Sequence, residues 1–303
     1  MQTIISINSA IDLRRTDRHR SGELPPDDIS GLACHVLTVD AQGGSRRSHA
    51  ESQLSALPLR YEFVDGIDAS RHTEPSLINA SSTNASRIGP SRSDRRPSID
   101  NAVYSRWRNR LYMKRSMTEG EIAVYMGHRR IWQRIVDGDA DAAMVLEDDF
   151  TISCPAAFMT AVSAAVVNGS RWDIVKLFDY RNNRKIVRRS EWGGGGFVQY
   201  RYPSSGCVAY LINRESCRRL LARTRLARPV DVDLSHPWEF GLRTWSLQSG
   251  VVGEAAASLG GSLLEPQRQT HRSTLRSIYG NVLSMNKLIR SAIYHRQLSI
   301  ENG

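Results

Sequence analysis

The chain has 303 residues, 40% of them hydrophobic, which is enough for one large domain or two small ones with a buried core. It carries 41 Lys and Arg against 31 Asp and Glu, a net charge of +10, which favours polyanionic partners: nucleic acid, phosphorylated substrates or an anionic membrane surface. No run of 18 apolar residues occurs, so we expect no transmembrane helix, and the first residues lack the pattern of a secretory signal.

The four cysteines are scattered along the chain and form no C-x-x-C pair. This spacing predicts neither a zinc site nor a disulfide framework. It is typical of reduced thiols in a cytosolic protein, so we expect a cytoplasmic location.

The first predicted elements form a strand–helix–strand unit. Residues 34–40, "CHVLTVD", have the pattern of a buried strand that ends on an acid, residues 43–57 that of a loop leading into a helix, and residues 60–68 that of a second strand. Residues 1–33 precede this unit as a lead segment. Residues 71–110 are rich in Ser and Arg, and we interpret them as a basic insertion, either a loop or disordered.

The clearest predicted helix spans residues 117–137. Thr118 and Glu121 have the spacing of a capping box at its start, and Gly138 is expected to end it. The apolar residues that share one face at helical spacing are Ile122, Tyr125, Met126, Trp132, Ile135 and Val136.

Strands and helices continue to alternate after this helix. The expected elements are a strand at 142–149, a helix at 154–169, a strand at 172–180, a strand turning into a helix at 206–224, and a basic helical segment within 266–303. The four glycines at 193–196 indicate a mobile lid or a hairpin turn. This order predicts an α/β domain with a mostly parallel sheet flanked by helices.

Three consecutive acids, Glu147, Asp148 and Asp149, directly follow the predicted strand "AAMVL". In open α/β sheets, ligands bind beyond the carboxyl ends of the strands. A hard divalent cation such as Mg²⁺ or Mn²⁺ would neutralise such a cluster and would itself bind substrate phosphates. The alternative is a solvated acidic turn, and spacing alone does not separate the two.

The segment "MTEGEIAVYMGHRRIWQRIVDGDADAAMVLEDD" (117–149) resembles a block of glycosyltransferase family 25, in which L-T-x-G-E-I-G and S-H-x-x-x-W precede V-L-E-D-D. The matching residues are Thr118, Gly120, Glu121, Ile122, His128, Trp132, Leu146, Glu147, Asp148 and Asp149. Weaker similarity runs from about residue 34 to about residue 265. The chain departs from the pattern at Gly127 and Ala123, and the family's small G-T-A-like run is replaced by residues 204–207.

The resemblance implies a GT-A-like, Rossmann-type domain over residues 34–265 that transfers a sugar from a UDP-sugar donor with Mn²⁺ or Mg²⁺. Galactose is the family's commonest donor sugar, and the acceptors implied are saccharides or lipid-linked saccharides of lipopolysaccharide and cell-surface glycans. Such acceptors suit a basic protein at the anionic inner face of a membrane. We therefore expect an inverting hexosyltransferase.

The resemblance also assigns roles at the acidic cluster. Asp149 and Asp148 are the expected metal ligands, and Glu147 is expected to orient a neighbour or contact the sugar of the donor. Arg46 and Arg47 follow the first strand, where a guanidinium fits a phosphate or frames the uracil, or is simply solvated.

Two further donor-binding residues are expected. Asp40 ends the first strand and would bind ribose hydroxyls. His128 lies on the edge of the apolar helix face, where it is either a buried structural histidine or a donor-positioning residue.

An inverting transfer needs a general base for the acceptor hydroxyl. The segment "RPVDVDLSHPWE" supplies Asp231, the first choice, and Asp233. These two also form a D-x-D triplet, a rival metal site, and His236 would complete the metal shell at the acidic cluster.

Two other functions use the same features. One is a catalytically inactive, glycosyltransferase-like or basic nucleic-acid-binding protein, and the other is a nucleotidyltransferase. Nucleic acid is disfavoured because the arginines are not interleaved with aromatic residues and no known binding motif occurs.

Overall fold

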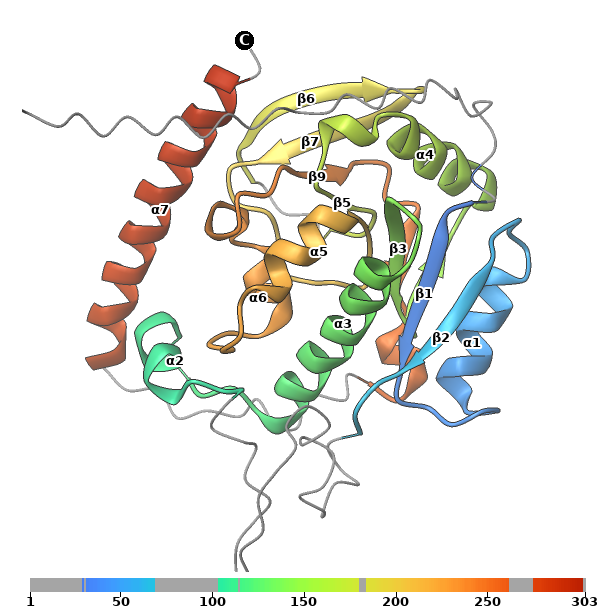
Figure 1. Cartoon of the computed structure of the whole chain (residues 1–303), viewed down its shortest axis with the longest axis horizontal. Helices are drawn as coiled ribbons and strands as arrows, with labels where there is room; N and C mark the ends of the chain where they lie inside the picture. Colours follow the sequence, from blue (N-terminus) through green and yellow to red (C-terminus); the bar gives the residue numbers. More distant parts are fainter. Residues whose placement is uncertain are drawn as a thin grey trace, which may run out of the picture.

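The computed structural model describes residues 29, 31–68, 103–113, 115–179, 184–261 and 275–301. A central sheet runs through the molecule with helices on both faces (Figure 1). The strands are β1 Ala33–Thr38, β2 Tyr61–Asp65, β3 Ala142–Glu147, β4 Phe150–Ile152, β5 Ile174–Lys176, β6 Ile186–Trp192, β7 Gly195–Tyr200, β8 Ala209–Asn213, β9 Thr244–Leu247 and β10 Val252–Glu254. The α-helices are α1 Ser45–Leu54, α2 Arg106–Tyr112, α3 Glu119–Asp137, α4 Pro155–Val167, α5 Arg214–Leu221, α6 Val230–Leu234 and α7 Leu275–Glu301. Short 3₁₀ turns lie at η2 Gly169–Arg171, η3 Pro237–Glu239 and η4 Ala256–Leu259.

Eight strands form the main sheet in the order β2-β1-β3-β8-β5-β9-β7-β6, and β10 pairs with β4 in a separate two-stranded sheet. Parallel pairing joins β2, β1 and β3 at one end and β5 with β9 further along. The strand β8 runs antiparallel between β3 and β5, and the β6–β7 hairpin joins β9 antiparallel. The α/β class is confirmed and is consistent with a GT-A-like fold; the sheet itself is mixed.

Strand β3 shows why this sheet is covered on both faces. Its side chains alternate, so that Met144 and Leu146 enter one apolar cluster while Ala143 and Val145 enter the other. Helices α1 and α4 contribute to the first cluster, and α3 and α5 to the second. A strand buried on both faces reads as a continuous apolar run, and polar residues appear only where it leaves the core.

Helix α3 forms as predicted. The Thr118 hydroxyl accepts from the Glu121 amide at 3.1 Å and the Glu121 carboxylate accepts from the Thr118 amide at 3.0 Å, completing the capping box. A Cβ atom at Gly127 would lie 2.7 Å from the Leu37 side chain, so a residue without a side chain lets α3 approach β1. This close approach carries the next residue, His128, against the sheet.

The structure adds detail to two expectations from the sequence, the glycine run at 193–196 and the insertion at 71–110. The glycine run includes the turn of the β6–β7 hairpin, where Gly193 and Gly194 have φ of 51° and 81°. The expected insertion falls mostly outside the described residues, but its end forms part of α2. The side-chain amide of Asn109 anchors this helix by donating to the Ala227 carbonyl at 2.8 Å. That end is therefore ordered helix, not loop.

The basic C-terminal segment forms α7, which packs one face on the rest of the molecule (Figure 1). The Ser291 hydroxyl donates to the Arg201 carbonyl at 2.7 Å, and the Tyr294 hydroxyl donates to the Leu242 carbonyl. In the part of the chain that the structure describes, no helix combines the length and apolar character needed to cross a bilayer.

Candidate functional site

The carboxyl ends of β1 and β3 meet at one edge of the sheet. The two strands are parallel, with Leu37 opposite Glu147, so the residues that follow each strand are neighbours. Asp148 and Asp149 thus lie beside Thr38, and all three side chains are buried. The expected position of the acids, at the carboxyl end of a core strand, is where the structure has them.

The guanidinium of Arg46 lies against two of these acids. Its Nη1 is 2.9 Å from Asp148 Oδ1 and 3.3 Å from Asp149 Oδ2, and its Nη2 donates to the Gly261 carbonyl at 2.7 Å. Arg46, in the first turn of α1, thus supplies a positive charge to acids that have no basic neighbour in the sequence, and it is buried rather than solvated. Its expected contact with phosphate or uracil stays a prediction.

Two residues at the end of β1 hold this arrangement. The Thr38 hydroxyl donates to Asp148 Oδ2 at 2.7 Å and accepts from the Asp40 amide at 3.1 Å. The Asp40 carboxylate accepts from the Arg46 amide at 2.9 Å. Asp40 therefore fixes the start of α1, and with it Arg46, while its expected contact with ribose stays a prediction.

One buried carboxylate oxygen has no partner among the described residues. Asp149 Oδ1 is shielded from solvent and accepts no hydrogen bond. Burial raises the pKa of Asp149 to about 7, with the charges of Glu147 and Asp148 adding to the effect and Arg46 opposing it. A buried, unpartnered anionic oxygen beside a second carboxylate fits the oxygen ligands that Mg²⁺ and Mn²⁺ prefer. Asp149 and Asp148 are thus the residues that would hold such a cation.

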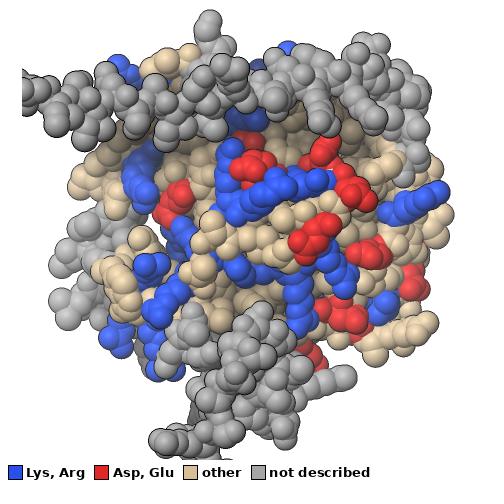
Figure 2. Space-filling view, viewed as in Figure 1, with Lys and Arg blue, Asp and Glu red and all other residues tan. Residues whose placement is uncertain are grey.

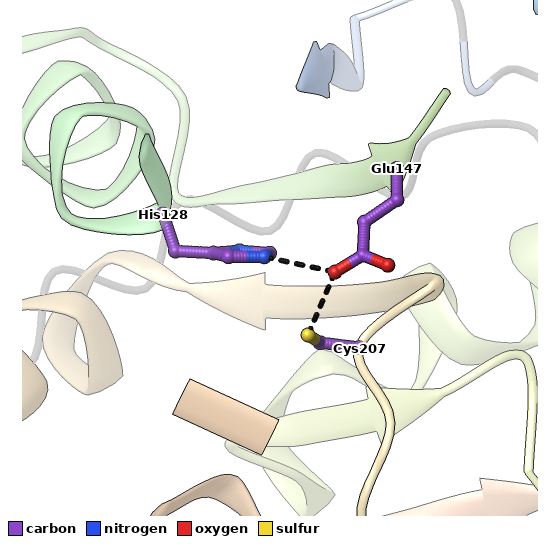
Figure 3. A group of neighbouring side chains, drawn as sticks. All are labelled: His128, Glu147 and Cys207. Atoms are coloured by element: carbon purple, nitrogen blue, oxygen red, sulfur yellow. Dashed lines mark hydrogen bonds and ion pairs between the residues drawn. The ribbon is translucent and has the colours of Figure 1, made fainter. Parts of the chain in front are cut away.

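Glu147 contacts a different set of side chains (Figure 3). Its Oε1 lies 3.2 Å from His128 Nε2 and 2.8 Å from the Cys207 sulfur, while a quarter of its side chain, 24%, is exposed. Burial acts to raise the pKa of Glu147, but His128, Cys207 and Arg46 together hold it below its ordinary value. His128 itself is fully buried, as expected of a core histidine, and it contacts Glu147; its expected role in positioning the donor stays a prediction.

The donor atoms of His128, Glu147 and Cys207 all lie within 4.8 Å of one another, close enough to be considered as a metal site. Nitrogen and sulfur donors favour a softer cation than Mn²⁺ or Mg²⁺. This group is therefore chemically distinct from the pair formed by Asp148 and Asp149.

Lys176 ends β5 and is also buried near the site. Its ammonium donates to the Ser204 carbonyl at 2.6 Å and the Ser204 hydroxyl at 2.9 Å. Burial lowers the pKa of Lys176, opposed by Asp179, Cys207 and Asp231. Because Asp231 acts electrostatically on both Lys176 and Cys207, its carboxylate shares their environment. Asp231 thus remains the base or acceptor-binding candidate.

Asp233 lies in a different environment. It is fully buried, and its carboxylate accepts from the Tyr125 hydroxyl at 2.8 Å and pairs with Arg223 and Arg228, both at 2.7 Å. A general base needs contact with the acceptor hydroxyl. We therefore withdraw Asp233 from the catalytic set, because its oxygens are enclosed by structural partners, and with it the D-x-D triplet as a metal pair.

His236 belongs to the same region as Asp233. Its Nδ1 donates to the Val232 carbonyl at 2.7 Å, and its ring packs edge-on against Trp238. Burial and the charges of Arg228 and Lys287 lower the pKa of His236 to about 3. The positive charges of Arg228 and Lys287 near the ring disfavour a bound cation. No described contact joins His236 to Asp148 or Asp149, so we leave it out of the metal set.

Arg47 stacks its guanidinium 4.3 Å from the centre of the Phe63 ring and lies 3.6 Å from the Asp65 carboxylate. These contacts attach α1 to β2. Arg47 is therefore held by protein contacts, while its expected contact with phosphate or uracil stays a prediction.

Sequence reasoning missed Thr38, Lys176, Cys207 and Tyr210. Thr38 and Lys176 end the observed strands β1 and β5, but they lie inside the predicted strands 34–40 and 172–180, so the strand-end rule that selected the three acids did not select them. Cys207 and Tyr210 carry no such signal, since they look like core residues until the contact with Glu147 and His128 is known.

Known proteins resemble this chain over most of the part that the structure describes. A protein-family model described as glycosyltransferase family 25 (LPS biosynthesis protein) matches residues 41–235. A glycosyltransferase 25 family member of Aedes aegypti is 24% identical over 236 residues, 76% of this chain and 34% of the relative. One of Anopheles gambiae is 29% identical over 236 residues (76% and 35%), and one of Drosophila pseudoobscura pseudoobscura 27% over 168 residues (54% and 26%). The chain thus spans about a third or less of the length of these relatives.

Proposed function

Because the chain belongs to glycosyltransferase family 25, we propose that it moves a hexose, galactose in the first instance, from a UDP-sugar to a saccharide acceptor with a divalent cation. The observation that carries the proposal is Oδ1 of Asp149, which is buried beside Asp148 at the carboxyl end of β3 and accepts no hydrogen bond from the described residues. The cluster has three acids and one arginine, so it retains the negative charge that a divalent cation would balance.

In this proposal Asp149 and Asp148 hold Mn²⁺ or Mg²⁺. When bound, the cation neutralises the diphosphate and the charge that develops as it leaves. Thr38 and Arg46 keep the Asp148 carboxylate in place, and Asp40 keeps Arg46 in place by fixing the start of α1. The protein's own contribution is to keep these oxygens oriented before the donor arrives.

Glu147 and Asp231 would act on the sugars. The partly exposed Glu147 carboxylate contacts a hydroxyl of the donor sugar. Asp231 takes the proton of the acceptor hydroxyl, as an inverting transfer requires. Support for Asp231 is electrostatic: its charge acts on Lys176 and Cys207, and Cys207 contacts Glu147.

The acceptor proposed is a saccharide or lipid-linked saccharide of lipopolysaccharide or another cell-surface glycan, met at the cytoplasmic side of a membrane. Basic side chains predominate near α2 and α7 on the face shown in Figure 2, whereas acidic ones are more frequent toward α3. An anionic acceptor or membrane surface would be attracted to the basic side.

The test is a donor screen that measures UDP release from UDP-galactose, UDP-glucose and UDP-N-acetylglucosamine, with Mn²⁺, with Mg²⁺ and with chelator. The proposal expects cation-dependent release from one UDP-hexose that increases with acceptor. Turnover of a nucleoside triphosphate, or binding of nucleic acid with a steep salt dependence, would instead identify one of the two rival functions.

A further inference from the structure

A buried chain of hydrogen bonds leads from the core to Glu147. Trp132 Nε1 donates to the Tyr210 hydroxyl at 3.0 Å, that hydroxyl lies 2.9 Å from His128 Nδ1, and His128 Nε2 lies 3.2 Å from Glu147 Oε1. Trp132, Tyr210 and His128 are all buried, and the His128 and Tyr210 rings stack at 5.8 Å between centres. The members come from α3, β8 and the end of β3, so the chain spans three elements.

The chain has a direction that the residue types set. An indole nitrogen can only donate, so the Tyr210 oxygen accepts from Trp132. The single Tyr210 proton then goes to His128 Nδ1, which must be the unprotonated nitrogen of the ring. The proton of a neutral His128 is therefore on Nε2, where it is donated to Glu147. The opposite tautomer would leave the Tyr210 hydroxyl proton without an acceptor among its described contacts.

Cys207 completes the arrangement. Its thiol donates to the same Glu147 oxygen, Oε1, at 2.8 Å, from the segment that precedes β8. Two donors on one oxygen fix the rotation of the carboxylate. Figure 3 shows the second oxygen, Oε2, directed away from both donors. The carboxylate is thus held by one oxygen, and the other is available to a ligand.

We propose that Trp132, Tyr210 and His128 are positioning residues that, together with Cys207, orient Glu147 so that its Oε2 accepts a hydroxyl of the transferred sugar. The inference rests on the proposed function, since it concerns the sugar of the donor. It concerns specificity as well as rate, because a fixed acceptor oxygen discriminates a correctly placed hydroxyl from one of opposite configuration. Positioning of this kind is most effective when buried partners hold the contacting group rigidly.

The same three ligating side chains, His128, Glu147 and Cys207, also have the composition of a site for a soft cation. Binding there would require Nε2 and the thiol to lose their protons, and the Tyr210–His128 hydrogen bond would have to reverse. The observed contacts satisfy every member without a cation. The positioning arrangement is therefore the one that the geometry favours.

The first experiment compares Tyr210→Phe with wild type in the full-length chain. The variant keeps the ring that stacks on His128 and removes only the hydroxyl that donates to His128 Nδ1. We expect kcat/KM for the UDP-sugar to fall by about tenfold, the scale of one or two lost hydrogen bonds, while the dissociation constant for UDP changes by less than about twofold. A purely structural defect would weaken UDP and UDP-sugar alike.

A pair of variants tests the thiol, and a third is the matched control. Cys207→Ser keeps a donor and should retain most of the activity, whereas Cys207→Ala should show the same selective loss as Tyr210→Phe. Tyr294→Phe removes another buried tyrosine hydroxyl, which donates to the Leu242 carbonyl on the α7 side, and should leave the sugar-dependent step unchanged. Equal activity of wild type, Tyr210→Phe and Cys207→Ala would overturn the proposal.

A third measurement needs no substrate, so it separates failure of this inference from failure of the proposed function. Nitrogen NMR of His128 in the free protein should show a proton on Nε2 and an unprotonated Nδ1 that accepts a hydrogen bond, and Tyr210→Phe should remove the shift of Nδ1 caused by that bond. A proton on Nδ1 in wild type would contradict the proposal. So would stoichiometric binding of Cd²⁺ with a thiolate absorption band that disappears in Cys207→Ser, since the three residues would then be ligands.

Discussion

Two clusters of acids in this molecule, each of which contains a sequence candidate for a cation ligand, differ in their partners. The first is Glu147, Asp148 and Asp149, where the ion pairs of the described residues include one guanidinium, that of Arg46, bound to Asp148 and Asp149. The second is Asp233 and Glu239, which meet several guanidinium groups. Its ion pairs join Asp233 to Arg223 and Arg228, and Glu239 to Arg223, Arg228 and Arg290.

Acids outnumber guanidinium groups in the first cluster, whereas guanidinium groups outnumber acids in the second. The pKa values of the acids follow this difference in charge. In the first cluster burial and neighbouring acids raise the pKa of Asp149 to about 7. In the second, burial acts to raise the pKa of Glu239, but Arg228 and Arg223 lower it to about 2. An excess of acid leaves an oxygen that can bind a cation, whereas an excess of base gives a structural ion-pair network. The ratio of acids to guanidinium groups therefore distinguishes a candidate binding site from a structural cluster. The D-x-D spacing in the sequence does not make this distinction.

The largest expected effect is on catalysis at the first cluster. We expect Asp149→Asn to reduce transfer by roughly a thousand-fold, about 4 kcal/mol of lost stabilisation, because it removes a charged ligand of the cation. The midpoint of thermal unfolding should be unchanged or higher, since a poorly neutralised buried charge is lost. The matched control is Asp137→Asn, at an exposed acid whose carboxylate accepts from Gln133 at 2.8 Å. Full, cation-dependent activity in Asp149→Asn would place the site elsewhere.

The second cluster should give the opposite result. Asp233→Asn removes one of the two carboxylates that pair with Arg223 and the buried Arg228 and leaves Glu239 as the other, so we expect the free energy of unfolding to fall by about 3 kcal/mol. Activity per folded molecule, measured well below the unfolding midpoint, should stay near wild type. Loss of activity without loss of stability would return Asp233 to the catalytic set.

The pH dependence of stability sharpens the comparison. The pKa of Glu239 is about 2 in the folded protein against an ordinary 4.5, so its contribution is complete above 4.5 and is lost as the pH falls toward 2. A shift of this size corresponds to about 3 kcal/mol as an upper figure. Urea unfolding at a series of pH values should show a steep acid limb that Glu239→Gln flattens. An unchanged acid limb in the variant would contradict the ion-pair network.

The smallest effect concerns the support of the first cluster. Thr38→Val keeps the shape of the side chain and removes the hydroxyl that donates to Asp148. Partners of metal ligands typically matter by tenfold or more, so the Mn²⁺ concentration for half-maximal activity should rise about tenfold. Thr160→Val, at an exposed helix threonine of α4, is the control. An equal Mn²⁺ requirement in Thr38→Val and Thr160→Val would show that Thr38 does not support cation binding.

Much of the fold could be predicted from the sequence, because local patterns determine it. The capping box at Thr118, the apolar run before Glu147 and the order of strands and helices all describe neighbours along the chain. The glycine run indicated the turn of the β6–β7 hairpin as one of two alternatives. The antiparallel place of β8 was not predicted, since pairing between distant segments leaves no periodic signal in one sequence.

The candidate site was predicted only in part for the same reason. The acids at the end of β3 follow from strand position. The partner of Asp148 is an arginine 102 residues earlier, and the partners of Asp233 include a tyrosine 108 residues earlier. No local pattern gives these contacts, so sequence alone showed neither the ion pairs of Arg46 nor the structural partners that enclose Asp233.

The central claim is that the end of β3, and not the D-x-D triplet, holds the cation. Titration of Mn²⁺ in the presence of UDP, followed by electron paramagnetic resonance, tests it directly in wild type, Asp149→Asn and Asp233→Asn. The account predicts one bound Mn²⁺ per chain in wild type and Asp233→Asn and none in Asp149→Asn. Retention of Mn²⁺ by Asp149→Asn, together with its loss in folded Asp233→Asn, would contradict it.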